Sequence, residues 1–362
     1  MPDAPRKSSE PGQFLKALRK EPVSHTPVWI MRQAGRYLIE YRRLRKKITF
    51  SALCREPELC AELTVMAQRK LGTDAAIIFA DLLPVLETIG AKIRYPEGDG
   101  GGIRVDFALS GESWKHPSEV AVHQAHVGEA LELARRALPR VIALLGFSGA
   151  PFTLASYLIE GGSSRSFLKV RRFMKRRTEL WDKLMQVLSR VVAAYARMQT
   201  ACGADAVQIF DTWAGCLTRE EYRQYVLPYQ KKLIGTISKE ARVIHFGVRT
   251  GHLLDLLSEA GGDVIGVDHA TPLGAAWKKA GYHKAVQGNL DPRVLLGSKS
   301  GIRTAVGKIL DQAEGRPGHI FNLGHGILPQ TPVGNAKYLV EVVHKESARR
   351  IQARGSSGSV RA

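Results

Sequence analysis

Short apolar runs alternate with longer amphipathic stretches along most of the chain, and this pattern predicts alternating strands and helices. The runs are rich in β-branched residues, which favour strands. Eight runs are present, at residues 27–31, 75–80, 141–145, 206–210, 242–246, 263–267, 284–286 and 319–323. Helical periodicity fills the stretches between them, at residues 54–71, 120–138, 179–202, 219–238 and 250–259, and a last helix is expected at 335–353.

Continuous apolar strands that alternate with helices are typical of a parallel sheet covered on its outer face. Eight such units predict a closed (β/α)8 TIM-type barrel, which is an α/β fold. An open doubly wound sheet is the competing architecture, but no predicted strand is followed by the Gly-x-Gly-x-x-Gly fingerprint of that fold. We expect one barrel domain over residues 13–353, a polar tail at 1–12 and a flexible tail at 354–362.

A barrel of this type carries its chemistry at the carboxyl ends of its strands. A strand-end aspartate often caps the next helix, and a histidine beside a glycine turn can be structural, so each polar residue there has two interpretations. Pro84, shortly after Asp81, disfavours a simple capping role for that aspartate. Polar or glycine residues follow most of the predicted strands: Arg32, Asp81, Gly146, Asp211, Thr212, Gly247, Asp268, the segment 287–289, Gly324 and His325.

The segment 29–39 reads Trp-Ile-Met-Arg-Gln-Ala-Gly-Arg-Tyr-Leu-Ile and places two arginines where an apolar run ends. Arginine stays charged over the useful pH range and binds carboxylates or phosphates through two parallel hydrogen bonds. Arg32 and Arg36 therefore indicate a ligand with several acid groups. The alternative is that Arg36 pairs with Glu40 on a helix.

Two long connections differ in what they predict. Residues 94–110 contain four glycines between alternating segments, which predicts an inserted hairpin without chemistry. Residues 146–162 contain many small residues that let the backbone approach a ligand, and Pro151 opens a helical turn. Tyr157 lies about two turns into that helix, where its hydroxyl could face the strand ends; packing is the alternative role.

The composition is basic, with a net charge of +19 and a pI near 9.9, so nucleic-acid binding has to be considered. Basic clusters lie at residues 42–47 and 165–177, but neither is accompanied by an aromatic-interleaved strand or a recognition-helix signature. Steering of an anionic small molecule explains them equally well, and solvated helix faces account for most of the individual lysines and arginines. No apolar run approaches a membrane span, and residues 1–12 lack a secretory signal. We expect a cytoplasmic protein with reduced cysteines. Without a Cys-x-x-Cys pair, neither a metal site nor a disulfide is predicted.

With these residues in view, the chain resembles the uroporphyrinogen decarboxylase family over about residues 14–353. The stretch Met-Arg-Gln-Ala-Gly-Arg-Tyr at 31–37 is similar to the first family signature, and residues 146–160 to the second. Further similarity lies at residues 79–84, 211–215, 287–292 and 322–326. The resemblance implies a cytoplasmic (β/α)8 barrel, commonly a homodimer, that removes carbon dioxide from the four acetates of uroporphyrinogen III without metal or cofactor.

The resemblance also implies roles for individual residues. Asp81 would accept hydrogen bonds from the pyrrole N–H groups and stabilise the cation that forms on the ring. Arg32 would act on the reacting acetate or deliver a proton. Substrate binding would involve Arg32, Gln33, Ala34, Gly35, Arg36, Asp81, Tyr157, Thr212 and His325, with Tyr157 also in the catalytic set. The chain departs from the family pattern at Ile39, Thr212 and His269, where Pro, Ser and an aromatic residue are usual.

A related barrel family, the zinc-dependent methyltransferases that act with corrinoid proteins, is the main enzymatic alternative. Those enzymes use a His-x-Cys motif on the fifth strand and a further Cys at the eighth. Here the corresponding stretches read His245-Phe246-Gly247 and Gly324-His325, so the thiolates are missing. We therefore expect a small tetrapyrrole substrate, and neither nucleic acid nor membrane as a partner.

Overall fold

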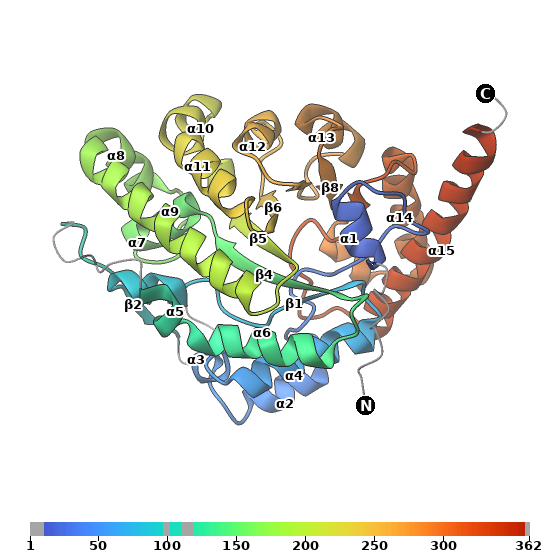
Figure 1. Cartoon of the computed structure of the whole chain (residues 1–362), viewed down its shortest axis with the longest axis horizontal. Coiled ribbons are helices and arrows are strands. Elements are labelled where there is room, and N and C mark those ends of the chain that lie inside the picture. Colours follow the sequence, from blue (N-terminus) through green and yellow to red (C-terminus); the bar gives the residue numbers. More distant parts are fainter. Residues whose placement is uncertain (1–10, 97–101, 111–113, 115–118, 359–362) are drawn as a thin grey trace, which may run out of the picture.

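The structure is a computed structural model that describes residues 11–96, 102–110, 114 and 119–358 (Figure 1). A parallel sheet of seven strands curls through its centre in the order β1-β4-β5-β6-β7-β8-β9. Seven of the eight expected strands are therefore confirmed, and the fold is α/β. The strands are β1 (Ala75–Ile77), β4 (Ala143–Gly149), β5 (Ala206–Asp211), β6 (Arg242–Gly247), β7 (Val264–Gly266), β8 (Ala285–Gln287) and β9 (His319–Ile320).

Helices follow the strands and lie around the outside of the sheet (Figure 1). The main ones are α4 (Pro57–Leu71), α6 (Ala125–Ala137), α9 (Thr178–Ala201), α11 (Leu227–Ile237), α12 (Leu254–Ala260), α13 (Leu273–Ala280), α14 (Lys299–Ala313) and α15 (Val333–Gly358). Shorter helices are α1 (Gln13–Leu18), α2 (Ile39–Arg45), α3 (Phe50–Leu53), α5 (Val120–His123), α7 (Pro151–Glu160), α8 (Leu168–Arg176) and α10 (Arg219–Tyr225), with 3-10 turns η1 (Pro84–Ile89), η3 (Ala214–Cys216) and η4 (Pro292–Leu296). None of the described helices is long and apolar enough to cross a membrane.

Several element boundaries differ from the expected ones. The helix expected at 219–238 is two helices that meet at Val226, because Pro228 lacks an N–H group and begins a new helix, α11. The helix expected at 120–138 is likewise divided at Gln124. α15 continues to Gly358, past the domain boundary expected at residue 353. Most of the expected tail at 1–12, and residues 359–362, lie outside the described residues.

The eighth expected strand, at residues 27–31, is not formed, and a complete eight-stranded barrel is therefore not confirmed. The segment does lie between β9 and β1: Phe321 N donates to Pro27 O (2.8 Å), and Asp74 N donates to Val28 O (2.8 Å). Val28 forms a single parallel bridge with Phe321.

Side chains explain why the ladder stops at one bridge. Pro27 has no N–H group, and the carboxylate of Asp74 accepts a hydrogen bond from the N–H of Val28 (2.7 Å). The side-chain amide oxygen of Asn322 accepts a hydrogen bond from the N–H of Met31 (3.0 Å). In the described part of the chain, only Trp29 N of this segment donates to the neighbouring backbone, at Phe321 O (3.3 Å), whereas the N–H groups of Val28 and Met31 are bound by side chains.

The concave side of the sheet is closed by a chain of buried hydrogen bonds. Trp29 Nε1 donates to Gln287 Oε1 (2.8 Å), and Gln287 Nε2 donates to Gln208 Oε1 (2.9 Å). Gln208 is on β5 and Gln287 on β8, which are not neighbours in the sheet. Their side chains therefore meet across the interior, and the segment with Trp29 contributes to the same core.

His319 in β9 is a buried histidine with a predicted effect on stability. Its Nε2 donates to Gly288 O (3.1 Å), and burial lowers the pKa of the imidazole to about 4. In the unfolded chain a histidine has a pKa near 6.5, so it binds a proton as the pH falls below that value. In the folded chain His319 stays neutral until the pH approaches its lower pKa. We expect the free energy of unfolding to fall by about 3 kcal/mol from this group as the pH drops from about 6.5 to 4.

Urea unfolding at several pH values in this window measures the effect. His319→Gln keeps an amide donor for Gly288 O and does not titrate, so its unfolding free energy should depend less on pH. Parallel curves for the two proteins would show that His319 does not carry this pH dependence.

Candidate active site

The turn that carries Arg32 is held in an unusual conformation at the edge where the strands end. Arg32 has a φ of 65°, a left-handed conformation that costs non-glycine residues about 1–2 kcal/mol. Gln33, which is fully buried, stabilises the turn because its Oε1 accepts from Ile30 N (3.2 Å) and its Nε2 donates to Ala75 O (3.2 Å). A Cβ on Gly35 would lie 2.8 Å from the carbonyl oxygen of Arg32, so glycine permits the tight turn. Ala34, between them, is half-buried.

Arg32 and Arg36 are both exposed and have no ion-pair partner among the described residues. The alternative pairing of Arg36 with Glu40 is wrong, since Glu40 Oε1 instead accepts from Lys70 and its Oε2 has no partner within the described part of the chain. Desolvation lowers the pKa of Arg32, and the charge of Arg36 lowers it further. Solvent therefore reaches the Arg32 side chain, while neighbouring atoms partly desolvate it. The two free guanidiniums fit an anionic ligand there.

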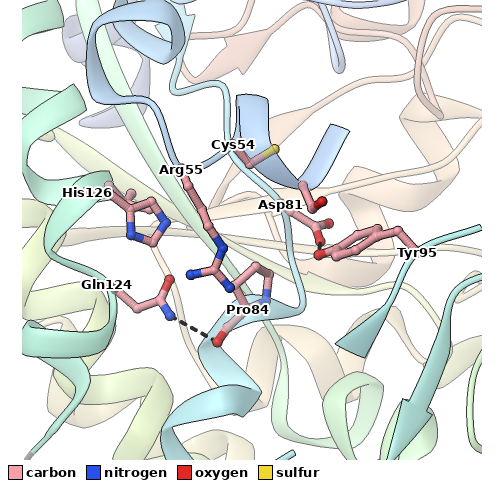
Figure 2. A pocket seen from close by; sticks show the side chains of 9 residues that line it. Cys54, Arg55, Asp81, Pro84, Tyr95, Gln124 and His126 are labelled. Carbon is pink, nitrogen blue, oxygen red and sulfur yellow. Dashed lines mark hydrogen bonds between the residues drawn. The ribbon is translucent and has the colours of Figure 1, made fainter. Parts of the chain in front are cut away.

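Asp81 follows β1, as expected for a group at the strand ends. Its Oδ1 accepts from Leu82 N (2.7 Å), and its Oδ2 accepts from the hydroxyl of Tyr95 (Figure 2). Burial raises the pKa of the Asp81 carboxyl, while the hydrogen bonds from Tyr95, Leu82 and Leu83 oppose that shift. The carboxyl group is thus fixed by short-range contacts and is directed toward protein groups, not outward to bulk solvent.

Tyr157 lies on α7, which begins at Pro151 after the extended Ala150. It is half-buried, and its ring is 5.9 Å from that of Trp213. Desolvation raises the pKa of the Tyr157 phenol, the negative charge of Asp81 raises it further, and the positive charge of Arg32 lowers it. Tyr157 therefore lies within electrostatic reach of both residues, although it is 76 positions from Asp81 and 125 positions from Arg32 in the sequence.

His325 is half-buried between two glycines that permit close approach. A Cβ on Gly324 would lie 2.1 Å from His269 N, and one on Gly326 would lie 2.5 Å from Arg32 Cδ. Desolvation lowers the pKa of His325, and the positive charge of Arg32 lowers it further. The imidazole is thus kept neutral beside Arg32, where an N–H can donate to an anion.

The remaining strand-end residues divide between this region and the outer layer. Thr212, directly after β5, is half-buried. Its neighbour Asp211 is fully buried, 3.5 Å from the hydroxyl of Tyr222 on α10 and 3.7 Å from Nε2 of His245. The carboxylate of Asp268 is also already hydrogen-bonded within the protein, because its Oδ2 accepts from Arg249 N (2.6 Å). These two aspartates stabilise the fold.

Sequence reasoning missed Tyr95. The hairpin expected at 94–110 is present as β2 (Lys92–Arg94) and β3 (Arg104–Asp106), and Tyr95 directly follows β2. Its contact with Asp81 joins two loops 14 positions apart, and hydrophobic periodicity carries no signal for such a contact. The nearby pocket is lined by Ser51, Cys54, Arg55, Asp81, Pro84, Tyr95, Gln124, His126 and Val127 (Figure 2).

Tyr95→Phe tests whether this hydroxyl positions Asp81. The hydroxyl lowers the pKa of Asp81, so its removal should raise that pKa and move the acidic limb of the activity profile to higher pH. A hydrogen bond to a charged group contributes about 1.5–3 kcal/mol, so we expect kcat/KM to fall by roughly 10- to 100-fold. The pH dependence of kcat/KM measures both effects.

Tyr229→Phe is the matched control, because Tyr229 also donates to an aspartate, Asp182 (2.8 Å), but on the helical outer layer. Its pH profile should match that of the unmodified protein. An unshifted acidic limb in Tyr95→Phe would contradict a positioning role for Tyr95.

Comparisons with known proteins show to which family the chain belongs. The family model described as uroporphyrinogen decarboxylase (URO-D) matches residues 10–346. A protein of Carboxydothermus hydrogenoformans named uroporphyrinogen decarboxylase is 46% identical over 340 residues, which cover 92% of this chain and 96% of that protein. Another of that name, from Koribacter versatilis, is 43% identical over 343 residues, with 94% and 98% covered.

A solved structure of a methyltransferase from Methanosarcina mazei has a TM-score of 0.75 at 20% identity and covers 92% of this chain and 98% of its own. At that identity the likeness shows the fold alone. The family model and the relatives together span nearly the whole chain, including every residue of the site described above. The chain belongs to the uroporphyrinogen decarboxylase family.

Proposed function

We propose that this protein converts uroporphyrinogen III to coproporphyrinogen III by decarboxylating its four acetate side chains. One observation carries the proposal: two guanidiniums without ion-pair partners in the described chain, Arg32 and Arg36, share the strand-end region with the buried carboxyl group of Asp81. The substrate has eight carboxylates around four pyrrole N–H groups. Cations at the rim and a single anion near the ring nitrogens match that distribution of charge.

The chemistry explains why a carboxylate is needed under the ring. Loss of carbon dioxide from an acetate leaves an electron pair on a methylene carbon, so the pyrrole is first protonated at the adjacent carbon and becomes the electron sink. The bond to the carboxylate then breaks, and its electron pair neutralises the ring cation. A proton then converts the exocyclic methylene to methyl, and the proton added to the ring carbon is lost again, which restores the neutral pyrrole; each decarboxylation therefore consumes one proton. Asp81 would accept the pyrrole N–H groups and stabilise the cation, without acting as a base.

The other residues would bind and orient the acid side chains. Arg32 would act on the reacting acetate or deliver the proton, and Arg36 would bind a second acid group. Tyr157, Thr212 and His325 would donate hydrogen bonds to further carboxylates. In the binding loop, Gln33 would act by holding the turn, since its side chain is already bonded, and Ala34 and Gly35 would let the backbone approach the substrate.

We further propose that the segment 27–31 stands in for an eighth strand and closes a (β/α)8 barrel, supported by its hydrogen bonds to Phe321 and Asp74. The domain would span residues 13–353, and the enzyme would act as a cytoplasmic homodimer without metal or cofactor in the reaction. Steering by the basic clusters stays a prediction. In the cluster at 165–177, Arg171 and Lys175 pair with Glu221 (2.9 and 2.6 Å), so these two cations are partly neutralised.

Anaerobic incubation with uroporphyrinogen III tests the function. We expect the seven-, six-, five- and four-carboxylate porphyrins to be resolved by chromatography after oxidation, with the four-carboxylate product accumulating. Four molecules of carbon dioxide should be released per substrate. If the purified, folded protein left the eight-carboxylate substrate intact, the proposal would be wrong.

A further inference from the structure

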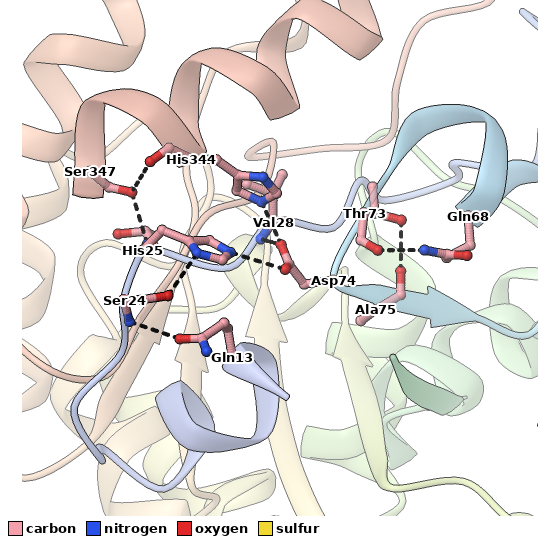
Figure 3. A network of polar contacts seen from close by, with 11 residues as sticks. Gln13, Ser24, His25, Val28, Gln68, Thr73, Asp74, Ala75, His344 and Ser347 are labelled. Carbon is pink, nitrogen blue, oxygen red and sulfur yellow. Dashed lines mark hydrogen bonds and ion pairs between the residues drawn. The ribbon is translucent and has the colours of Figure 1, made fainter. Parts of the chain in front are cut away.

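A second cluster of chemically capable side chains lies at the opposite end of the sheet (Figure 3). His25 comes from the amino-terminal segment, Asp74 immediately precedes β1, and His344 comes from α15. Because β1 runs from residue 75 toward Asp81, Asp74 marks the amino-terminal edge of the sheet, away from the candidate active site. The proposed decarboxylation uses none of these three residues.

Both imidazoles are directed at the same carboxylate. His25 Nε2 is 3.3 Å from Asp74 Oδ1, and His344 Nε2 is 2.7 Å from Asp74 Oδ2 (Figure 3). All three potential ligand atoms lie within 4.8 Å of one another. In a tetrahedral site with bonds of 2.0–2.2 Å, the ligand atoms are separated by about 3.4 Å. Side-chain movements on the order of 1 Å would therefore bring all three atoms onto one ion.

The charge and surroundings of the cluster fit a cation. Asp74 supplies a carboxylate, and each of its oxygens faces one of the two imidazoles. Ser24 Oγ lies 3.1 Å from His25 Nδ1 and can accept a hydrogen bond from the tautomer that carries its proton on Nδ1; in that tautomer Nε2 has a lone pair with which to bind an ion. The side chains are 25%, 15% and 29% exposed, so an ion can enter from solvent.

We propose that His25, Asp74 and His344 form a divalent transition-metal site, with Zn²⁺ as the best match and water completing the coordination. Two imidazoles and a carboxylate are a recurrent ligand set for zinc, and the hard oxygen-only ligands that Ca²⁺ or Mg²⁺ require are not provided here. The ion would join the amino-terminal segment, the start of β1 and α15. Its role would be to stabilise the end of the fold at which the strands begin.

Tag-free, chelator-treated protein titrated with Co²⁺ and with Zn²⁺ tests the site. We expect one equivalent of Co²⁺ to give visible ligand-field absorption, and Zn²⁺ to displace it. Calorimetry with Zn²⁺ should give the same stoichiometry, and the thermal midpoint should rise saturably because the ion binds only the folded chain. Weak binding without a one-to-one end point, or no absorption, would refute the proposal.

Variants assign the binding to these residues. His25→Gln and His344→Gln should each weaken Zn²⁺ binding at least tenfold and abolish the thermal shift, whereas His123→Gln should not. His123 is the matched control because its Nε2 also faces a carboxylate, that of Glu119 (3.2 Å), but without a third ligand in the described structure. Unchanged affinity in a folded His25→Gln or His344→Gln protein would overturn the assignment.

Two measurements keep this test independent of folding defects and of the enzymatic activity. Circular dichroism of the metal-free variants reports whether each is folded, and His25→Gln decides the question if His344→Gln is not. Uroporphyrinogen turnover by metal-free protein should equal that of the zinc-loaded protein, because the cluster and the candidate active site are at opposite ends of the sheet. A protein that binds no zinc would therefore leave the proposed decarboxylase activity untouched. A protein without decarboxylase activity would likewise leave the proposed metal site untouched.

Discussion

Asp81→Ala is expected to lower kcat/KM for uroporphyrinogen III by about 10²–10³-fold, the usual effect of removing a preorganised group that stabilises transition-state charge. The carboxylate would accept pyrrole N–H groups in the ground state, and its interaction strengthens as the ring becomes cationic. Asp81→Glu keeps the charge but moves it by one methylene, so its loss should be smaller. Anaerobic initial rates of product formation over a range of substrate concentrations measure these changes.

Asp81→Asn separates charge from hydrogen bonding. The amide keeps an acceptor oxygen but cannot neutralise the ring cation, so its kcat should fall nearly as far as that of Asp81→Ala. Because Asp81 also accepts from Tyr95 and Leu82, the thermal midpoint of each variant has to be compared with that of the unmodified protein. Full activity in a folded Asp81→Ala protein would remove this residue from the mechanism.

Arg32→Ala should have the second largest effect, a fall in kcat/KM of about 10²-fold or more, because a misplaced reacting group alone can cost that much. The guanidinium has no competing ion pair in the described structure, so its binding capacity is available to the substrate. Arg32→Lys keeps the positive charge but loses the planar pair of donors, and we expect an intermediate rate. Steady-state kinetics of the two variants separates charge from geometry.

The backbone of Arg32 needs its own control, since φ is 65° and every non-glycine residue there bears the same strain. Arg32→Ala and Arg32→Lys share that strain, so their difference reports the side chain. Arg293→Ala controls for general loss of positive charge, because Arg293 is exposed and paired with Asp291 (2.5 Å). A kcat/KM for Arg32→Ala within about twofold of that for Arg293→Ala would contradict the role of Arg32.

Local patterns were sufficient for most of the architecture. Seven apolar runs form strands of one parallel sheet, and the glycine-rich connection at 94–110 forms the expected hairpin. Both signals are local, because they depend on the spacing of apolar residues and glycines that are close together in the sequence. The run at 27–31 did not become a ladder strand, because side chains from distant residues, Asp74 and Asn322, bind its N–H groups. No periodicity within the run could reveal those competitors.

The candidate site shows the same division. Arg32, Asp81, Tyr157 and His325 could be selected from strand ends and family motifs, and the structure brings Tyr157 within electrostatic reach of Asp81 and Arg32, and His325 within reach of Arg32. Motifs did not distinguish Asp81 from Asp211, which ends β5 but is fully buried beside Tyr222 of α10 and His245 of β6. They also did not reveal Tyr95 as the partner of Asp81 or Lys70 as the partner of Glu40.

The amino-acid sequence by itself determined the α/β class, the succession of strands and helices, the family, and the types of residue available at the strand ends. Those properties depend on the composition and spacing of neighbouring residues. Only the tertiary structure decided which carboxylates are already bonded, which arginines remain free, and that His25, Asp74 and His344 converge at the other end of the sheet. Hydrogen bonds and charges act over a few ångströms in space, and the fold brings together residues that are far apart in the sequence, such as His25 and His344, which are 319 positions apart.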